Sequence, residues 1–166
     1  MDALKTLTLA GALAAGLAGG ALAYETVKIP TLPAPGIVDG DLADASWKKA
    51  YVTKPFTAIK PGGSVTEETV ARLFCTADAL YVGAKCSFAD YALREKIVND
   101  KSKSGFSGDC IELFVDPGDT GNYAHIAVNV AGNVTSTGTV APIRCAVQLY
   151  KTHWMMEAEI PFSSLK

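Results

Sequence analysis

Short β-type runs separated by turn residues are the feature of this sequence that most constrains its fold. Such runs occupy residues 37–38, 69–75, 80–86, 110–115, 123–130, 143–149 and 154–160. Their length, their content of β-branched and aromatic residues, and the glycine, proline and aspartate between them are typical of antiparallel strands. We therefore predict an all-β fold, an antiparallel β-sandwich of the jelly-roll kind.

The two faces of the predicted strands differ in chemistry. Successive side chains on a strand point to opposite faces. In the run at 110–115, apolar side chains alternate with Cys110, Glu112 and Phe114. One face thus suits a core, and the other carries a carboxylate, an aromatic ring and a thiol. Before this run, residues 90–99 are expected to form one or two helical turns, and residues 100–108 a polar loop tipped by Phe106.

The first 23 residues have the pattern of a removable export signal. Lys5 precedes an apolar run at 7–22 that ends in the small-residue motif Ala21-Leu22-Ala23. Residues 24–36 form a proline-rich lead-in, and residues 37–166 suffice for one domain. No other stretch approaches the ~20 apolar residues that span a bilayer. We expect a secreted or periplasmic protein without membrane contact after signal cleavage.

The charge balance argues against a polyanionic partner. The formal net charge is −2, and it stays at −2 without the signal, which holds one lysine and one aspartate. A weakly acidic chain offers no basic surface for phosphates. We therefore expect no nucleic acid or acidic lipid as a partner.

Four cysteines, at positions 75, 86, 110 and 145, lack the close spacing of metal-binding pairs. In an exported chain such residues usually form disulfides. Cys86 ends one predicted strand and Cys110 begins the next, so we expect this pair to form a bond that contributes roughly 3 kcal/mol. Cys75 and Cys145 would then pair by elimination.

Five motifs stand in order along residues 37–165: IVDGDLADASWKKA, DALYVGAKC, FSGDCIELFVDP, AVNVAGN and WMMEAEIPFSSL. They resemble the family 9 carbohydrate-binding modules, whose β-sandwich is shared with DOMON-type domains. The first resembles that family's Asp-Gly-x-Leu-x-Asp-x-x-Trp opening, and the second its Leu-Tyr-Val strand. The third is similar to its aromatic-x-x-Asp-x-x-Glu-x-Phe-x-Asp signature, the fourth to its Val-Asn strand end, and the fifth to its Glu-x-x-Ile-Pro-Phe landmark.

The resemblance implies a non-catalytic domain that binds polysaccharide or oligosaccharide, such as xylan or cellulose. It also implies cooperation with a glycoside hydrolase in carbohydrate catabolism. The family's sugar-stacking Trp falls on Phe106, and its hydrogen-bonding Glu falls on Glu112. A sugar packs its C–H face on an aromatic ring, and a carboxylate accepts charge-assisted hydrogen bonds from hydroxyls. Asn129 and His125 are the further candidates for carbohydrate binding.

The sequence departs from the family pattern in two places. The family's arginine on the strand before the Val-Asn step is Ala127 here, so a main hydroxyl donor is absent or replaced. The family's second stacking Trp follows the Ile-Pro-Phe strand, and this chain stops at Lys166. We therefore expect the C-terminal strands, and with them half of the sugar clamp, to be missing.

Several notable residues have a structural interpretation. Trp47 lies among small residues after the Asp-Gly turn, and Trp154 begins an apolar alternation, so both are expected in the core. Glu157 and Glu159 share one face of their strand, which we expect to be the solvated face.

Carboxylates in this sequence do not form a convincing catalytic or metal site. Asp39, Asp41 and Asp44 suit side-chain-to-backbone bonds in turns better than a calcium site, so we expect no cofactor, and a structural calcium ion stays open as the alternative. Asp109 and Glu112, three residues apart, should point to opposite faces of a strand, which excludes a glycosidase pair. We expect no enzyme activity.

Two alternative functions stay open. DOMON-type folds include haem-binding electron carriers, and Met155, Met156, His125 and His153 are candidate axial ligands. The chain could instead act as a docking or scaffold domain for a hydrolase.

Overall fold

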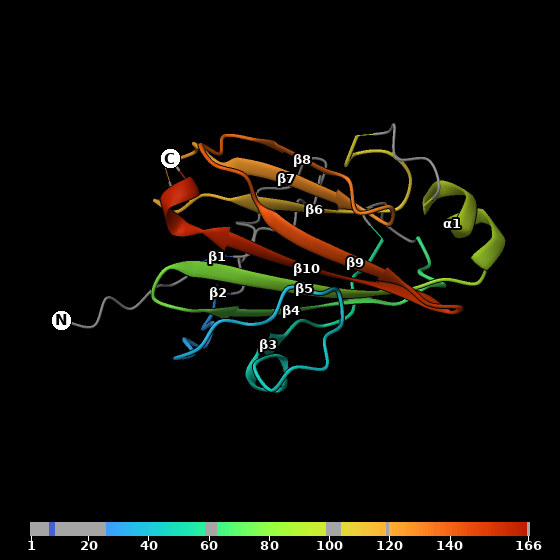
Figure 1. Cartoon of the computed structure of the whole chain (residues 1–166), viewed down its shortest axis with the longest axis horizontal. Coiled ribbons are helices and arrows are strands. Elements are labelled where there is room, and N and C mark those ends of the chain that lie inside the picture. The colour runs from blue at the N-terminus through green and yellow to red at the C-terminus, as the bar shows by residue number, and fades with distance from the viewer. Residues whose placement is uncertain (1–6, 9–25, 59–62, 99–103, 119, 166) are drawn as a thin grey trace, which may run out of the picture.

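The computed structural model of the chain describes residues 7–8, 26–58, 63–98, 104–118 and 120–165. Within them, two antiparallel sheets pack face to face (Figure 1). The larger sheet has five strands in the order β3 (Tyr51–Val52), β4 (Thr69–Cys75), β5 (Ala79–Ser87), β10 (His153–Pro161) and β9 (Arg144–Leu149). The smaller sheet consists of β6 (Cys110–Val115), β7 (Ala124–Asn129) and β8 (Val134–Thr137). The predicted all-β antiparallel sandwich is confirmed.

Short elements complete the described chain. A two-residue strand, β1 (Leu7–Thr8), pairs with β2 (Thr26–Val27). The helical turns expected near residue 90 are present as α1 (Tyr91–Val98), and two 3-10 turns are η1 (Trp47–Lys49) and η2 (Phe162–Ser164). Apart from β1, the predicted export signal lies outside the described residues. None of the helices in the described ranges has the length and apolar character needed to cross a membrane.

The strand predictions included one strand that is absent and missed others, among them β8. Residues 37–38 form no strand, because the backbone turns there: Ile37 N donates to Asp44 Oδ2 at 2.9 Å, and Gly40 has a φ of 87°. Conversely, β8 was not predicted, because its Val-Thr-Ser-Thr sequence lacks the apolar alternation of a half-buried strand. The pairing of β8 with β7, rather than its own hydrophobicity, makes it a strand.

The main core fills the space between the two sheets. Alternate side chains of β5 and β10 face alternate side chains of β6 and β7, as the period of a strand requires. This inner layer includes Leu80, Val82, Ala84, Cys86, Ile111, Val115, Ile126, Val128, Trp154, Met156, Ala158 and Ile160. The prediction that Trp154 belongs to the core is confirmed, since it is 2% exposed.

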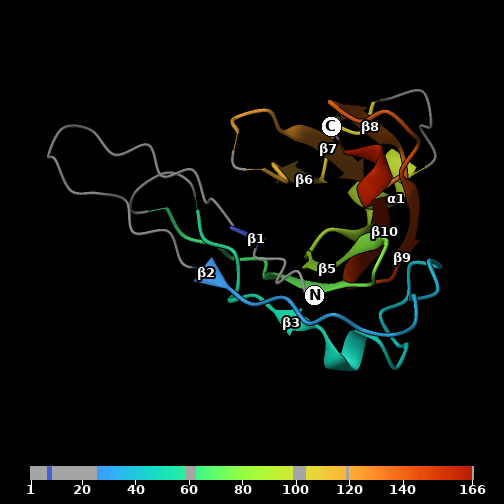
Figure 2. The ribbon, with the colours of Figure 1, turned by 90° about the vertical axis from the view of Figure 1, so that its left-hand side faces the viewer.

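Residues 32–50 cover the other face of the five-stranded sheet, opposite β6, β7 and β8 (Figure 2). Trp47 is fully buried there, with its ring 4.8 Å from that of Phe74, which stacks on Tyr81 at 4.6 Å. A Cβ on Gly83 would come within 2.4 Å of Leu42 Cδ2 and 3.1 Å of the Trp47 ring. Trp47 is therefore a core residue, as predicted, and glycine in β5 makes room for it.

Glu157 lies on this covered face and is fully buried, so its assignment to a solvated face was wrong. Its Oε2 accepts hydrogen bonds from Asp39 N at 2.8 Å and Gly40 N at 2.9 Å. Burial raises the pKa of the Glu157 carboxyl, and the two backbone N–H groups act in the opposite direction. Within the part of the chain that the structure describes, neither Trp47 Nε1 nor Glu157 Oε1 has a hydrogen-bond partner. The carboxylate thus joins the turn at residue 40 to strand β10.

The predicted disulfide between Cys86 and Cys110 was wrong. All four cysteines lie within the described residues, and no two of them are bonded, so the pairing of Cys75 with Cys145 is absent too. Cys86 points into the main core from β5. Cys110 lies on the outer face of β6, with its Sγ 3.9 Å from Glu112 Oε1. The in–out alternation along β6 turns the Cys110 thiol away from the core.

Candidate functional site

The outer face of the three-stranded sheet brings together a carboxylate, an imidazole and aromatic rings. Glu112 and Phe114 project from β6, and His125 projects from the neighbouring strand β7, where it is the register partner of Phe114. Their chain neighbours Ile111 and Ile126 are buried in the main core. Because strand side chains alternate, the burial of those neighbours fixes the polar and aromatic groups on the outside.

His125 is held between two phenylalanine rings. Its ring centroid lies 4.1 Å from that of Phe114 at an interplanar angle of 17°, and 4.8 Å from that of Phe106 at 54°. His125 Nε2 also lies 2.7 Å from Glu112 Oε2. This hydrogen bond becomes an ion pair when the imidazole is protonated. Of the predicted binding residues, the structure therefore brings Phe106, Glu112 and His125 together.

Phe106 reaches this face because its loop lies directly on β7 and β8. Gly105 N donates to Thr135 Oγ1 at 2.9 Å. A Cβ at Gly105 would come within 2.4 Å of Ala127 O and 2.7 Å of Thr135 N. The backbone can approach the sheet this closely only with glycine at that position, and the approach sets the Phe106 ring beside His125.

Ala127 is fully buried where the loop crosses β7. A longer side chain at this position would force the loop away from the sheet, because closely packed sites do not accept added volume without rearrangement. The small side chain of Ala127 and the position of the Phe106 loop therefore depend on each other.

Asn129 is fully buried, and its side chain serves the loops around it. Its Nδ2 donates to Ser104 O at 3.1 Å and Ser107 O at 3.2 Å. Its Oδ1 accepts from Ala131 N at 3.1 Å and Asn133 N at 2.9 Å. All of its polar atoms are thus used inside the protein. Asn129 holds the two ends of the loop that carries Phe106 and does not face solvent.

Two further rings on this face were not among the predicted site residues. Phe114 is 60% exposed and Tyr123 is 54% exposed, and their centroids are 5.5 Å apart. The alternation along residues 110–115 had already put Phe114 on the same face as Glu112. Tyr123 was included in a predicted strand without a role, because its contact with Phe114 crosses between strands.

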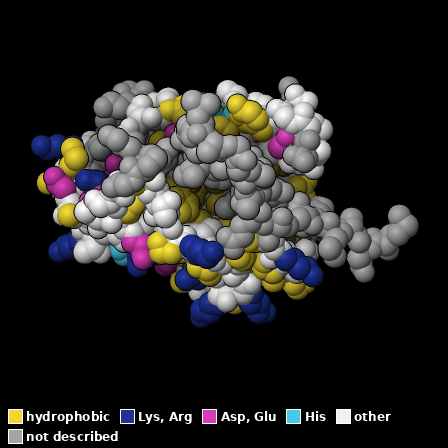
Figure 3. Space-filling view, turned by 180° about the vertical axis from the view of Figure 1, so that it is seen from behind, with side chains coloured by type: hydrophobic (Ala, Val, Ile, Leu, Met, Phe, Trp, Pro, Cys, Tyr) yellow, Lys and Arg dark blue, Asp and Glu magenta, His cyan; other side chains and the backbone are white. Residues whose placement is uncertain are grey.

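Hydrophobic side chains gather beside a histidine at the upper margin of the molecule in Figure 3, on the side of the three-stranded sheet. The exposed rings on this face are those of Phe106, Phe114 and Tyr123. A water-accessible surface with aromatic rings next to a carboxylate and an imidazole can bind a ligand that has both apolar and hydroxyl surfaces.

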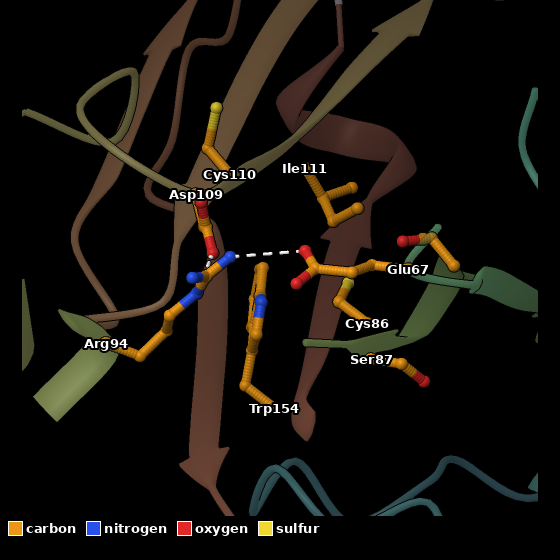
Figure 4. Close-up of a pocket in the computed structure, with 9 residues that line it drawn as sticks. Glu67, Cys86, Ser87, Arg94, Asp109, Cys110, Ile111 and Trp154 are labelled. Carbon is orange, nitrogen blue, oxygen red and sulfur yellow. Dashed lines mark hydrogen bonds and ion pairs between the residues drawn. The ribbon is translucent and has the colours of Figure 1, made fainter. Parts of the chain in front are cut away.

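A polar cavity of about 200 Å³ lies between the sheets beside α1 (Figure 4). Arg94 lines this cavity. Its Nε donates to Asp109 Oδ2 at 2.6 Å, and its Nη2 donates to Glu67 Oε2 at 3.3 Å. The guanidinium also lies 5.1 Å from the centre of the Phe88 ring. Arg94 therefore ties α1 to the segments before β4 and before β6, and its charge is matched by the two carboxylates. The lining is Glu67, Thr69, Cys86, Ser87, Arg94, Asp109, Cys110, Ile111 and Trp154.

Solved structures of carbohydrate-binding modules resemble this chain. A family 9 carbohydrate-binding module from Caldicellulosiruptor kristjanssonii in complex with cellotriose matches with a TM-score of 0.60 and 18% identity, over 81% of this chain and 66% of that chain. A family 9 module from the same organism in complex with glucose matches with a TM-score of 0.60 and 17% identity, over 82% of this chain and 70% of that chain. The chain thus spans about two thirds of the length of these structures.

The chain has the fold of a family 9 carbohydrate-binding module. At this level of identity the likeness establishes the fold. No protein-family model matches the sequence, and no curated protein matches it either.

Within this family 9 fold, the carboxylates considered for catalysis are used separately. Asp109 binds Arg94 at the cavity beside α1, whereas Glu112 binds His125 on the outer face. This separation agrees with the prediction that the two carboxylates point to opposite sides of the strand.

The aspartates near the start of the fold act as turn residues. Asp39 Oδ1 accepts a hydrogen bond from Asp41 N at 2.9 Å, and Asp44 Oδ2 accepts one from Ile37 N. Among the described residues, no group of three or more histidine, cysteine, aspartate or glutamate side chains is placed to hold a metal ion.

The candidate haem ligands lie apart on the family 9 fold. His125 is on the outer face of the three-stranded sheet, and Met156 is buried in the main core. His153 is on β10 of the five-stranded sheet, with its ring stacked on Tyr150 at 4.6 Å. Met155 is the chain neighbour of Met156 and points to the opposite face of β10, the face that also carries His153. The four side chains are therefore distributed over three different faces of the two sheets.

Proposed function

We propose that the chain binds carbohydrate on the outer face of its three-stranded sheet. Phe106 supplies the stacking ring, and Glu112 and His125 supply the hydrogen-bonding groups. The observation that carries this proposal is the placement of the exposed Phe106 ring beside the hydrogen-bonded carboxylate–imidazole pair. The complexes of family 9 modules with cellotriose and glucose support the ligand class, because those proteins share the fold.

The chemistry of the cluster suits a sugar. The C–H face of a pyranose packs on an aromatic ring, and its hydroxyls both donate and accept hydrogen bonds. Glu112 accepts with charge assistance, and it also accepts the N–H of His125 Nε2. The other ring nitrogen, Nδ1, then accepts a hydrogen bond from a hydroxyl when the imidazole is neutral and donates one when the imidazole is protonated.

Asn129 enters this proposal as a positioning residue. Its amide holds Ser104 O and Ser107 O, which flank Phe106 in the chain. A ring presented by a fixed loop loses less conformational entropy on binding than one on an unrestrained loop. The affinity attributed to Phe106 therefore depends on the buried amide.

The wider role that we propose is non-catalytic. The chain would act outside the cytoplasm, after removal of residues 1–23, by retaining polysaccharide near a glycoside hydrolase. The separate engagement of Asp109 and Glu112 supports a binding role over a catalytic carboxylate pair.

Native affinity electrophoresis tests the proposal. The purified chain is run in gels that contain xylan, hydroxyethyl cellulose, mannan or pectin, beside Phe106→Ala and Phe56→Ala. Phe56 is a matched control, because it is 43% exposed and its backbone N–H binds Thr69 O on the other sheet. Loss of one stacking contact of about 1.4 kcal/mol corresponds to a tenfold weaker affinity.

We expect at least one polysaccharide to retard the chain and Phe56→Ala equally, and to retard Phe106→Ala less. Far-UV circular dichroism establishes that each variant is folded. Equal retardation of Phe106→Ala would refute the site, and no retardation of the folded chain by any of the four polysaccharides would refute carbohydrate binding.

A further inference from the structure

We infer that the carbohydrate site extends beyond Phe106 to a second aromatic subsite made by Phe114 and Tyr123. The ligand is then a segment of an oligosaccharide or polysaccharide longer than a disaccharide, lying across β6 and β7. This inference rests on the proposed function of the cluster around His125 and specifies the length of ligand that it takes.

The rings form one unbroken row over the outer face. Phe106 and His125 have centroids 4.8 Å apart, His125 and Phe114 4.1 Å, and Phe114 and Tyr123 5.5 Å. Each step is a direct ring contact. A single sugar ring at Phe106 therefore leaves the far end of the row, at Tyr123, uncovered.

The far end of the row is more exposed than the near end. Phe114 and Tyr123 are 60% and 54% exposed, compared with 38% for Phe106. Among the described residues, neither Phe114 nor Tyr123 belongs to a buried core cluster. A solitary exposed ring on a protein surface needs no explanation, but rings in mutual contact form a continuous apolar surface that a ligand can cover.

Charge and size together select a glycan as the occupant. Glu112 lies beside the middle of the row, 2.7 Å from His125 Nε2, so a polar pair borders the apolar surface. Alternation of apolar and hydrogen-bonding groups matches a sugar chain, whose C–H faces and hydroxyls also alternate. A stable protein partner needs roughly 800 Å² on each side, which comprises about 20–30 residues. The row of four side chains is far smaller than that.

Isothermal titration calorimetry with oligosaccharides of increasing length tests the inference. The chain is titrated with di- to hexasaccharides of the cello-, xylo- and manno- series. The variants are Phe106→Ala, Phe114→Ala, Tyr123→Ala and the control Phe56→Ala. Tyr123→Phe is added because it keeps the ring and removes only the hydroxyl.

We expect the wild type to bind a hexasaccharide about tenfold more tightly than a disaccharide of the same series, which corresponds to one additional stacking contact. In Phe114→Ala and Tyr123→Ala, the ratio of these two affinities should fall towards one. In Tyr123→Phe and Phe56→Ala it should stay near the wild-type ratio. Thermal unfolding by circular dichroism identifies any variant that fails to fold.

The outcomes separate the two proposals. If Phe106→Ala weakens binding while Phe114→Ala and Tyr123→Ala keep the full dependence on length, the second subsite is refuted and the proposed function stands. If Phe106→Ala binds as the wild type does, or if no hexasaccharide gives a binding signal, the proposed function fails and the second subsite fails with it.

Discussion

Glu112 Oε2 lies 2.7 Å from His125 Nε2, and the two residues are diagonal neighbours on β6 and β7. Their side chains are 44% and 24% exposed, so solvent screens the pair. Exposed pairs of this kind contribute roughly 0–1 kcal/mol to stability. Replacement of Glu112 should therefore cost little stability, which allows its proposed role in binding to be tested separately from the fold.

Glu112→Gln should weaken carbohydrate binding about tenfold, because a hydrogen bond to a neutral amide is weaker than one to a carboxylate by about 1.4 kcal/mol. The free energy of unfolding should change by less than about 1 kcal/mol. Calorimetric titration and urea unfolding measure the two effects, with Glu68→Gln, on the exposed segment before β4, as the control. A large loss of stability with unchanged affinity would contradict the assignment.

Asn129→Asp should loosen the Phe106 loop while it keeps the turn after β7. The aspartate retains an acceptor for Ala131 N and Asn133 N, but it loses both donors to the loop carbonyls. Leaving these carbonyls unpaired should lower the free energy of unfolding by roughly 2–4 kcal/mol. Urea unfolding measures the loss, and Asn122→Ala, at an exposed position, should stay within about 0.5 kcal/mol of the wild type.

Glu157 should make the protein less stable as the pH rises. This is the opposite of the usual effect of a carboxylate, whose folded-state pKa is normally lowered. The folded-state pKa of Glu157 is raised from 4.5, mainly by burial, so the folded protein holds this proton more tightly than the unfolded chain does. The resulting stabilisation is fully present below the unfolded-state pKa and is lost as the pH rises through the folded-state pKa.

Glu157→Gln should remove this contribution, because glutamine does not titrate. The free energy of unfolding of the variant should therefore fall less steeply than that of the wild type as the pH rises from about 4. Urea unfolding at several pH values, with Glu68→Gln alongside, provides the slopes. Identical slopes for wild type and Glu157→Gln would show that the buried carboxyl does not titrate in this way.

Thiol labelling tests directly whether the protein contains a disulfide. Unreduced protein in denaturant should react with four equivalents of Ellman's reagent, because no disulfide joins any of the four cysteines. In the native protein the reaction should be slow, since burial raises the pKa of Cys86 and of Cys145 to about 12. Cys110 is less buried and should react first. Two reactive equivalents in denaturant would instead indicate one disulfide.

Local patterns predicted the sandwich well. The strands β4 and β6 have the bounds expected from their β-type runs, and their alternation correctly separated the core face from the face that carries Glu112. Resemblance to family motifs then selected Phe106 and Glu112, which lie close to His125 in the structure. These features depend on residues near one another in the chain, so the sequence contains the information.

Contacts between distant segments were harder to predict. Glu157 was assigned to solvent, because nothing in its own strand shows that the turn at Gly40, 117 residues earlier, covers it. Asn129 was assigned to a ligand, whereas the loop that its amide holds comes from residues 104–107. The contact between Phe114 and Tyr123 also required the strand register. In each case the deciding partner lies in another element.

The close fit of Trp47 over Gly83 also determines which positions of this fold can accept a new side chain. Because the five-stranded sheet is packed against another layer on each side, a new side chain in β5 meets atoms in either direction. The outward positions of β6 are not enclosed in this way, as the exposure of Phe114 illustrates. Sequence variation, whether by natural drift or by directed evolution, can therefore accumulate at such positions with little loss of stability, while the two-sided sheet stays nearly fixed.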